Sequence, residues 1–280
     1  MDKKIKILFI IIFVLIISII LFFGAMRYKN NSKYSIEEIW FYNDKDQKIF
    51  GELYKPKKDG KVPLIIYSHG LGSTYTVGEG YAEKLIDYDI AILTIDFRGG
   101  SDESKSDGST REMSIMTELD DLRTVLNEAK KWDFVDVDKI VVMGGSQGGV
   151  VSALMSAEDQ SINTAVLLYP ALTLPSYAAN MYKNGNIRDK MGSVYVGENY
   201  FSDVVDLDVY ETISKDENNI LILHGDEDGT VSISVSEKAL EVYKNVEFHV
   251  IEGAGHGFTG NNRKKALEYI IEYFKKNDII

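Results

Sequence analysis

The sequence predicts an α/β fold, in which a mostly parallel central sheet is covered by helices on both faces and a small cap is inserted late in the chain. Short, nearly uninterrupted runs of Ile, Val and Leu are typical of strands buried on both faces. Stretches with apolar residues at helical spacing separate these runs, and this alternation favours right-handed crossovers and a parallel sheet. The predicted central strands are residues 62–67, 90–95, 140–143, 165–168 and 220–223.

The first element is a strongly apolar segment. Residues 7–26 carry no charge and follow three lysines, and as a helix they would be about 30 Å long, the thickness of a bilayer's hydrocarbon core. We expect residues 1–33 to form an uncleaved membrane anchor and linker. A cleaved signal peptide is the alternative, but a cut after Ala25 would leave Phe23 where a small side chain is needed.

The sequence gives a weaker signal for the orientation of this anchor in the membrane. Three basic residues precede the apolar segment and three follow it, so the positive-inside rule barely discriminates. A tail of only six residues tends to stay in the cytoplasm, and we therefore expect the globular body, residues 34–280, on the extracytoplasmic side.

The remaining elements follow in chain order. Residues 36–42 and 48–54 alternate partly between apolar and polar side chains, which predicts an antiparallel pair at the start of the sheet. A final strand is expected at residues 246–251. The helix-like stretches are residues 80–88, 114–132, 148–157, 234–243 and 263–276.

One long stretch lacks any clear strand. Residues 171–215 are rich in aromatic side chains, and an unstructured loop of that length is uncommon in a compact domain. We therefore expect a small cap here. Tyr177 and Tyr182 are candidates for contact with an apolar part of a substrate, although aromatic residues of a cap could equally form its own core.

Composition excludes several classes of function. The chain has no cysteine, so disulfides, thiolate metal sites and a lipid-modified cysteine are excluded. Beyond residue 33 it carries 25 basic and 42 acidic side chains, a net charge of −17. Such a charge repels phosphate backbones, which argues against nucleic-acid binding.

The strongest local motif surrounds Ser146. An apolar strand runs into Gly144-Gly145-Ser146-Gln147-Gly148 and then into a helical pattern. A serine on such a strand-to-helix turn projects its hydroxyl from the top of the sheet, and the tight turn accepts only small neighbours. A phosphate loop would need a lysine, and a dinucleotide fingerprint would need glycine in place of Ser146. The pattern indicates a nucleophilic serine.

A second glycine-rich loop, residues 68–72, follows the strand at 62–67. Its glycines free a backbone N–H to point into a cavity. The amides of Leu71 and Gln147 could together form an oxyanion hole, the donor pair that stabilises a tetrahedral intermediate. We expect His69 to hold this loop by hydrogen bonds and to take no direct part in catalysis.

Two late loops supply an acid and a base. Asp226-Glu227-Asp228 follows the strand at 220–223, and His256 lies in a glycine-rich loop after the last strand. The chain order is then Ser, Asp, His, as the hydrolase arrangement requires. His256 is the natural general base. Of the three adjacent acids we favour Asp228 as its partner, and we expect Asp226 and Glu227 to cap turns.

These segments resemble the α/β-hydrolase superfamily over residues 36–280, and most of all bacterial cinnamoyl and feruloyl esterases and monoglyceride-lipase-like serine hydrolases. The resemblance rests on residues 69–72, 96–100, 107–118 and the His-Gly-x-x-Asp-x-x-Val run at 224–231. It implies an α/β-hydrolase fold, Asp228 as the catalytic acid, the amides of Leu71 and Gln147 as oxyanion donors, and a short cap. Relatives often have Gly-His-Gly after the Asp-Phe-Arg/Asn run, whereas this chain has Gly99-Gly100-Ser101, and a membrane anchor is not typical of the esterases. The fold and the reaction type therefore carry over, but the phenolic-ester substrate does not.

The expected function is hydrolysis of a small-molecule carboxylic ester through an acyl-enzyme on Ser146, activated by His256 and Asp228. No cofactor or metal is expected. A peptidase or an acyltransferase would use the same triad and remains an alternative. A non-catalytic, membrane-tethered binding module is the rival from another class, and it predicts a serine that does not react.

Overall fold

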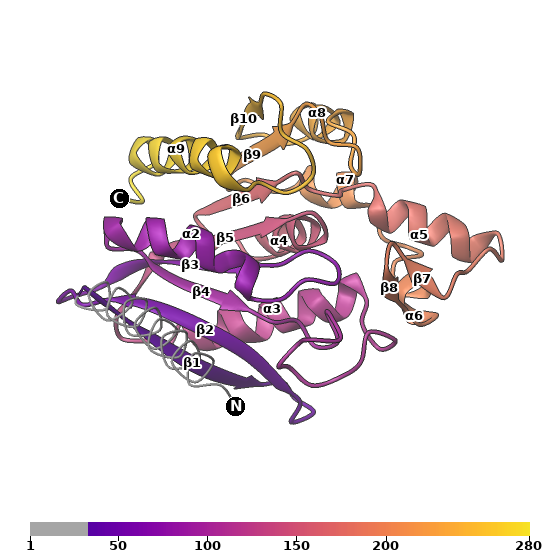
Figure 1. The fold of residues 1–280 in the computed structure, drawn as a ribbon, viewed down its shortest axis with the longest axis horizontal. Helices are drawn as coiled ribbons and strands as arrows, with labels where there is room; N and C mark the ends of the chain where they lie inside the picture. The colour runs from indigo at the N-terminus through magenta and orange to yellow at the C-terminus, as the bar shows by residue number, and fades with distance from the viewer. Residues whose placement is uncertain (1–32) are drawn as a thin grey trace, which may run out of the picture.

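A computed structural model describes residues 33–280, and its centre is an eight-stranded sheet (Figure 1). The strand order is β1-β2-β4-β3-β5-β6-β9-β10. β1 pairs antiparallel with β2 and β2 with β4, while every other pairing is parallel. The strands are β1 (Tyr34–Tyr42), β2 (Lys48–Pro56), β3 (Val62–Ser68), β4 (Ala91–Ile95), β5 (Val135–Gly145), β6 (Thr164–Leu168), β9 (Asn219–Gly225) and β10 (Val246–Ile251).

Helices cover both faces of this sheet, as the alternating sequence predicts. Side chains of β3 show the division, because Leu64 and Ile66 belong to one buried cluster and Ile65 and Tyr67 to the other. The first cluster is closed by α3 and α4, and the second by α2 and α9. The helices of the body are α2 (Thr76–Leu85), the 3₁₀ turn η1 (Ile86–Tyr88), α3 (Ile115–Ala129), α4 (Gln147–Glu158), α8 (Ser234–Leu240) and α9 (Gly260–Lys276).

The predicted elements differ from the structure mainly at their ends. The helix expected at 80–88 begins four residues earlier, at Thr76, and finishes as the separate turn η1. β5 begins five residues before the apolar run at 140–143, because Val135 already pairs with Val62 ahead of a register shift. An uninterrupted apolar run marks the buried part of a strand and does not reveal the more exposed part that precedes it.

Most of the segment between β6 and β9 lies beside the sheet, on the right in Figure 1, while its last helix packs against α4. The elements of this segment, which we call the cap, are α5 (Leu174–Lys183), a two-stranded hairpin of β7 (Lys190–Met191) and β8 (Val194–Tyr195), α6 (Asn199–Ser202) and α7 (Val209–Ile213). The cap has its own buried residues, including Tyr200, Phe201 and Val204, and these continue the core cluster on the α3–α4 face.

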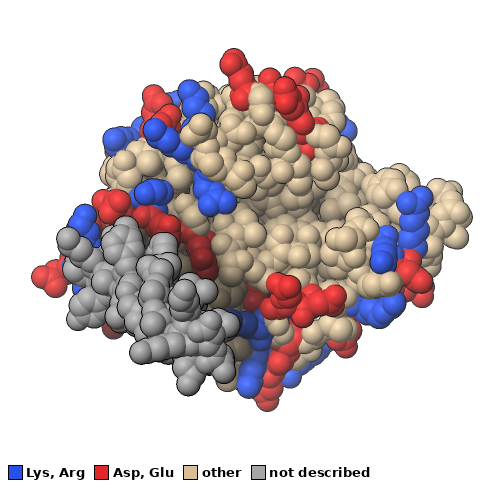
Figure 2. Space-filling model, viewed as in Figure 1, with Lys and Arg blue, Asp and Glu red and all other residues tan. Residues whose placement is uncertain are grey.

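Strand order places the chemistry-bearing loops at one edge of the sheet. β3, β5, β9 and β10 are parallel members of that sheet, so their carboxyl ends meet on the same side. Figure 1 shows the cap at that side. Figure 2 shows that charged side chains gather toward the edges of the visible face, while its middle carries few of them.

The predicted membrane anchor at residues 7–26 lies outside the described residues. Within residues 33–280, no helix combines the length and the apolar character that crossing a bilayer would require. The division into an anchor with its linker, a body and a cap at about 171–215 stays a prediction.

Candidate active site

Ser146 occupies a strained turn between β5 and α4. Its backbone has φ 55° and ψ −118°, a region that residues with a side chain rarely adopt. Two glycines make the turn possible. A Cβ on Gly144 would lie 2.2 Å from the carbonyl oxygen of Gly148, and a Cβ on Gly148 would lie 2.2 Å from that of Ser68. The sequence motif therefore marks two places where only hydrogen fits.

The three predicted residues meet in series at this turn. The Ser146 hydroxyl lies 3.0 Å from Nε2 of His256, and Nδ1 of the same ring lies 2.7 Å from Oδ2 of Asp228. Because a carboxylate only accepts hydrogen bonds, Nδ1 carries the proton and Nε2 is free to accept the serine proton. This is the geometry of a nucleophile, a general base and an acid that orients the base.

Asp228 is held as a carboxylate by several donors. Its Oδ1 accepts the backbone N–H groups of Thr230 at 2.8 Å and Val231 at 2.9 Å, and its Oδ2 faces His256. Burial opposes the charge, but these donors outweigh it and lower the pKa of Asp228 below its ordinary value. Asp228 is thus ionised at neutral pH, as an orienting acid must be.

The neighbouring groups have other roles. Asp226 accepts the backbone N–H of Gly253 at 2.6 Å. It therefore ties the loop after β9 to the loop after β10, a long-range contact in place of the expected cap of a local turn. His224 is fully buried, with Nε2 3.0 Å from the Val231 carbonyl and 3.3 Å from Asp228. Burial lowers the pKa of His224, so it remains neutral and serves as a donor to this loop.

The predicted oxyanion donors flank the serine. Gln147 is the first residue of α4, where backbone N–H groups have no partner within the helix. Leu71 lies on the opposite loop, and a Cβ on its neighbour Gly70 would be 3.3 Å from Cβ of Ser146. Within residues 33–280 neither the Leu71 nor the Gln147 N–H meets an acceptor, so both are available to an oxyanion.

His69 supports the loop of residues 68–72, as expected. We call this loop, which carries the Leu71 amide, the oxyanion loop. It is fully buried, its Nδ1 lies 2.8 Å from the carbonyl oxygen of Gly70, and its Nε2 accepts the N–H of Phe97 at 3.2 Å. Burial lowers the pKa of His69, which keeps the ring neutral with the proton on Nδ1.

A cavity of about 950 Å³ opens over Ser146 and His256. Its walls come from the oxyanion loop, α5, the β7–β8 hairpin and the loop after β9. Apart from three tyrosines, His256 is the sole titratable group among the described lining residues, since no Asp, Glu, Lys or Arg side chain is among them. Its apolar lining includes Leu71, Val77, Leu174, Tyr177, Met191, Val194, Val231 and Val235.

The two tyrosines predicted to contact substrate have different environments. Tyr177 lines the cavity and is 49% exposed. Tyr182 is absent from the lining and packs partly buried against the core cluster of the α3–α4 face. The five-residue separation turns the two side chains about 140° apart on α5, so one helix cannot direct both into one cavity.

Two features of the site escape sequence analysis. The rings of Tyr169 and His256 pack edge to face with their centres 4.9 Å apart, and the backbone of Tyr169 has a positive φ of 38°. Tyr200 of the cap donates a hydrogen bond to the Gln147 side chain, which also contacts Glu118. Neither pairing has a local signal, because the partners lie tens of residues apart. In residues 33–280 no group of three or more His, Asp or Glu side chains is arranged to hold a metal ion.

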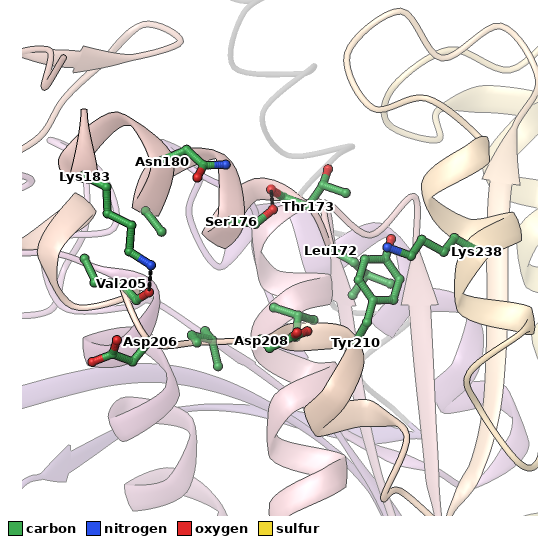
Figure 3. Close-up of a pocket in the computed structure, with 13 residues that line it drawn as sticks. Leu172, Thr173, Ser176, Asn180, Lys183, Val205, Asp206, Asp208, Tyr210 and Lys238 are labelled. Carbon is green, nitrogen blue, oxygen red and sulfur yellow. Dashed lines mark hydrogen bonds between the residues drawn. The ribbon is translucent and has the colours of Figure 1, made fainter. Parts of the chain in front are cut away.

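A second cavity of about 490 Å³ lies between α5, α7 and α8 (Figure 3). It shares Thr173, Ser176 and Asn180 with the first cavity, but unlike the first it is also lined by charged side chains. Its two lysines contact neighbouring groups. Lys183 donates to the Val205 carbonyl oxygen at 2.9 Å, and the Lys238 ammonium lies 4.0 Å from the ring centre of Tyr210. No residue of the triad lines it.

Comparison with known proteins places this geometry in a family. The model of the prolyl oligopeptidase family matches residues 81–278. The chain is 26% identical over 164 residues to the quorum-quenching protein AidA of Acinetobacter baumannii (strain MDR-ZJ06). This match covers 55% of the present chain and 52% of AidA. Over 236 residues the chain is 25% identical to dipeptidyl aminopeptidase BIII of Pseudoxanthomonas mexicana, covering 78% of this chain and 33% of that protein. The chain thus spans about half or less of the length of these curated relatives.

A solved structure supports the same placement. Est1E from Butyrivibrio proteoclasticus, determined with ferulic acid bound, superimposes with a TM-score of 0.76 at 26% identity. The match covers 86% of this chain and all of Est1E. The predicted α/β-hydrolase fold, with its mostly parallel sheet between two helical layers, is confirmed by this likeness and by the family match.

Proposed function

This chain belongs to the prolyl oligopeptidase family, and we propose that it is a serine hydrolase that cleaves small, uncharged carboxylic esters. The observation that carries the proposal is the Ser146–His256–Asp228 series at 3.0 and 2.7 Å, beside a cavity whose described lining holds no Asp, Glu, Lys or Arg.

The mechanism follows from the atoms in place. His256 Nε2 takes the proton of Ser146 as the hydroxyl oxygen attacks the ester carbonyl. The N–H groups of Leu71 and Gln147 stabilise the negative charge that develops on the carbonyl oxygen. The imidazolium then gives its proton to the leaving alcohol. In the second half of the reaction water attacks the acyl-enzyme while His256 takes a proton from it, and the imidazolium returns that proton to the Ser146 oxygen as the acid leaves. Asp228 keeps the ring in the required tautomer throughout.

The lining of the cavity favours an ester over a peptide. An aminopeptidase has to recognise a protonated amino group, and such a group is costly to bury without a carboxylate partner. No carboxylate lines the cavity in the described part of the chain. Its apolar walls instead suit an aliphatic or aromatic acyl group, in keeping with the ferulic acid bound to Est1E. Dipeptidyl aminopeptidase BIII is the relative that keeps the peptidase alternative open.

Activity-based labelling tests the proposal directly. A fluorophosphonate probe should label the full chain, and Ser146→Ala should abolish the labelling. Ser193→Ala is the matched control, since Ser193 lines the same cavity without belonging to the triad, and it should label normally. Absence of labelling in the unaltered protein would refute the proposal and favour a non-catalytic binding module.

Substrate assays then separate the reaction classes. We expect turnover of p-nitrophenyl esters of increasing chain length and of methyl ferulate, with little turnover of peptide p-nitroanilides that carry a free amino group. Transfer of the acyl group to an added alcohol in preference to water would instead indicate an acyltransferase.

We also propose that residues 1–33 anchor the enzyme in a membrane with the catalytic domain on the extracytoplasmic side. The support is the uncharged stretch at 7–26, which as a helix would match the thickness of a bilayer's hydrocarbon core. The protein should stay in the membrane fraction through alkaline carbonate washing, and protease added to intact cells should digest the body. Release by carbonate would refute the anchor, and a protected body would refute the orientation.

A further inference from the structure

We propose that the cap positions both N–H donors of the oxyanion hole, with Tyr200 acting as a positioning residue through the side chain of Gln147. The inference rests on the proposed function, in which the amides of Leu71 and Gln147 bind the oxyanion. It assigns the cap a role in transition-state stabilisation in addition to its contribution to the substrate cavity.

The side chain of Gln147 is clamped at both of its ends. Its Oε1 accepts a hydrogen bond from the Tyr200 hydroxyl at 2.7 Å, and its Nε2 donates one to Glu118 Oε2 at 2.9 Å. All three residues are fully buried. They come from α4, α6 and α3, so the clamp joins the nucleophile helix to the cap on one side and to the body on the other. A residue whose side chain is fixed at two points has little freedom to rotate its own backbone N–H.

The position of Tyr200 is itself fixed by contacts between α6 and the segment that leads into α3. The amide Nδ2 of Asn199 donates to the carbonyl oxygens of Glu112 at 2.9 Å and Met113 at 3.2 Å. The hydroxyl of Ser114, the N-cap of α3, donates to Asp203 at 2.7 Å. α6 is therefore fastened to the body by residues on both sides of Tyr200, and the tyrosine hydroxyl is held in place for Gln147.

A second part of the cap reaches the other donor. Gly72 follows Leu71 directly and has φ +71°, and a Cβ at Gly72 would lie 2.5 Å from Cγ2 of Val194 in β8. The hairpin thus packs on the oxyanion loop so closely that no side chain fits between them. On the far side the Gly72 N–H donates to the Gly100 carbonyl oxygen at 3.0 Å. The loop that carries the Leu71 amide is held between the cap and the body.

Removing the Tyr200 hydroxyl alone tests whether Tyr200 positions Gln147 or only fills space in the core. Phenylalanine would keep the aromatic volume in the core, but it would leave Gln147 Oε1 buried without a donor. A buried unsatisfied carbonyl favours rearrangement of its side chain. Complete removal of an oxyanion donor lowers kcat by about 10²–10³-fold. A donor that is displaced but still present should cost less, and we expect a loss of about tenfold.

The test is Tyr200→Phe in the full chain, with p-nitrophenyl butyrate as substrate and fluorophosphonate titration to count competent sites. We expect kcat per titrated site to fall about tenfold while KM changes less than twofold. The inhibition constant of a trifluoromethyl ketone, whose adduct with Ser146 places an oxyanion in the hole, should rise by the same factor. Tyr243→Phe is the matched control, because that hydroxyl is buried without a hydrogen-bond partner.

A double-mutant cycle isolates the route through Gln147. Gln147→Met removes both polar ends of the clamp and keeps the backbone amide, so Tyr200→Phe should add no further loss in that background. Glu118→Gln retains an acceptor for Gln147 Nε2 and should keep kcat within about threefold of the unaltered enzyme, whereas Glu118→Leu should lose activity as Tyr200→Phe does.

The inference fails if Tyr200→Phe loses no more kcat per site than Tyr243→Phe, if KM alone changes, or if the Tyr200 and Gln147 effects multiply. Each of these results leaves an enzyme that labels and turns over ester, so the proposed function would stand. Failure of the proposed function is a different result, in which the unaltered chain neither labels nor hydrolyses.

Discussion

Glu118→Gln should change how the stability of this protein depends on pH. Glu118 is fully buried in α3 close to the active site. Among residues 33–280 its sole charge-stabilising contact is the Nε2 donor of Gln147, and Oε1 has no partner there. Burial raises the pKa of Glu118 from 4.5 to about 8, with a further contribution from the nearby Asp121 carboxylate. Glutamine has the same shape and keeps an acceptor for Gln147, but it never has to lose a proton.

The sign and the size of the effect follow from proton linkage. Between pH 4.5 and about 8 the folded state holds a proton on Glu118 that the unfolded chain has lost. The free energy of unfolding therefore falls as pH rises through that window. Each tenfold change in proton affinity is worth about 1.4 kcal/mol, so the contribution amounts to as much as about 5 kcal/mol above pH 8. The raised pKa of Asp121, about 6, is shared by both proteins and largely cancels in the comparison.

Urea unfolding at pH 5 and pH 9 measures this difference. At pH 5 the two proteins should unfold at similar urea concentrations. At pH 9 the variant should be the more stable by several kcal/mol, with an unchanged dependence on urea because the same surface is exposed. A stability difference that stays constant within about 0.5 kcal/mol between the two pH values would refute the reasoning.

Three further predictions concern the triad, the cap and the nucleophile turn. Asp228→Asn should lower kcat by about 10⁴-fold, because an amide next to His256 Nδ1 favours the wrong tautomer. Tyr177→Ala should raise KM for long-chain and aromatic esters with little change in stability, whereas Tyr182→Ala should lower the free energy of unfolding by about 1–3 kcal/mol. Gly148→Ala should destabilise the fold by about 1–3 kcal/mol or more, since the new methyl group would lie 2.2 Å from a backbone carbonyl oxygen.

Steady-state kinetics and urea unfolding check all three, each against its own control. For Asp228→Asn, a loss of less than tenfold would contradict the orienting role. For the tyrosines, the reverse assignment of binding and stability effects would contradict their placement on α5. For Gly148→Ala, the control is Gly229→Ala, where nothing lies within 4 Å of the added carbon, and equal effects at both sites would rule out the steric explanation.

Some features of the site were readable because their causes are local. A strained serine requires Gly144 and Gly148 at fixed offsets, so the motif stands in five consecutive residues. The acid and histidine loops follow late strands directly, and parallel strands bring their carboxyl ends to one edge. The structure brings Ser146, His256 and Asp228 together where these rules place them, and it shows Asp226 engaged with Gly253 instead.

Other features needed the folded chain. Helical periodicity places Tyr177 and Tyr182 on one helix, but which of them lines a cavity depends on how α5 lies against the body. The Tyr200 contact with Gln147 spans 53 residues and the Glu118 contact spans 29, and no spacing rule links such positions.

By itself the sequence determined the layered α/β architecture, the chain order of nucleophile, acid and base, and the glycines that the nucleophile turn requires. These are consequences of periodicity and backbone sterics, which act over a few residues. The tertiary structure alone decided which cap tyrosine lines the cavity and how Tyr200 of α6 contacts the side chain of Gln147. Those outcomes depend on packing between distant segments. A hydrogen bond of 2.7 Å forms only when the backbones that carry the donor and the acceptor are both positioned to within a fraction of an ångström.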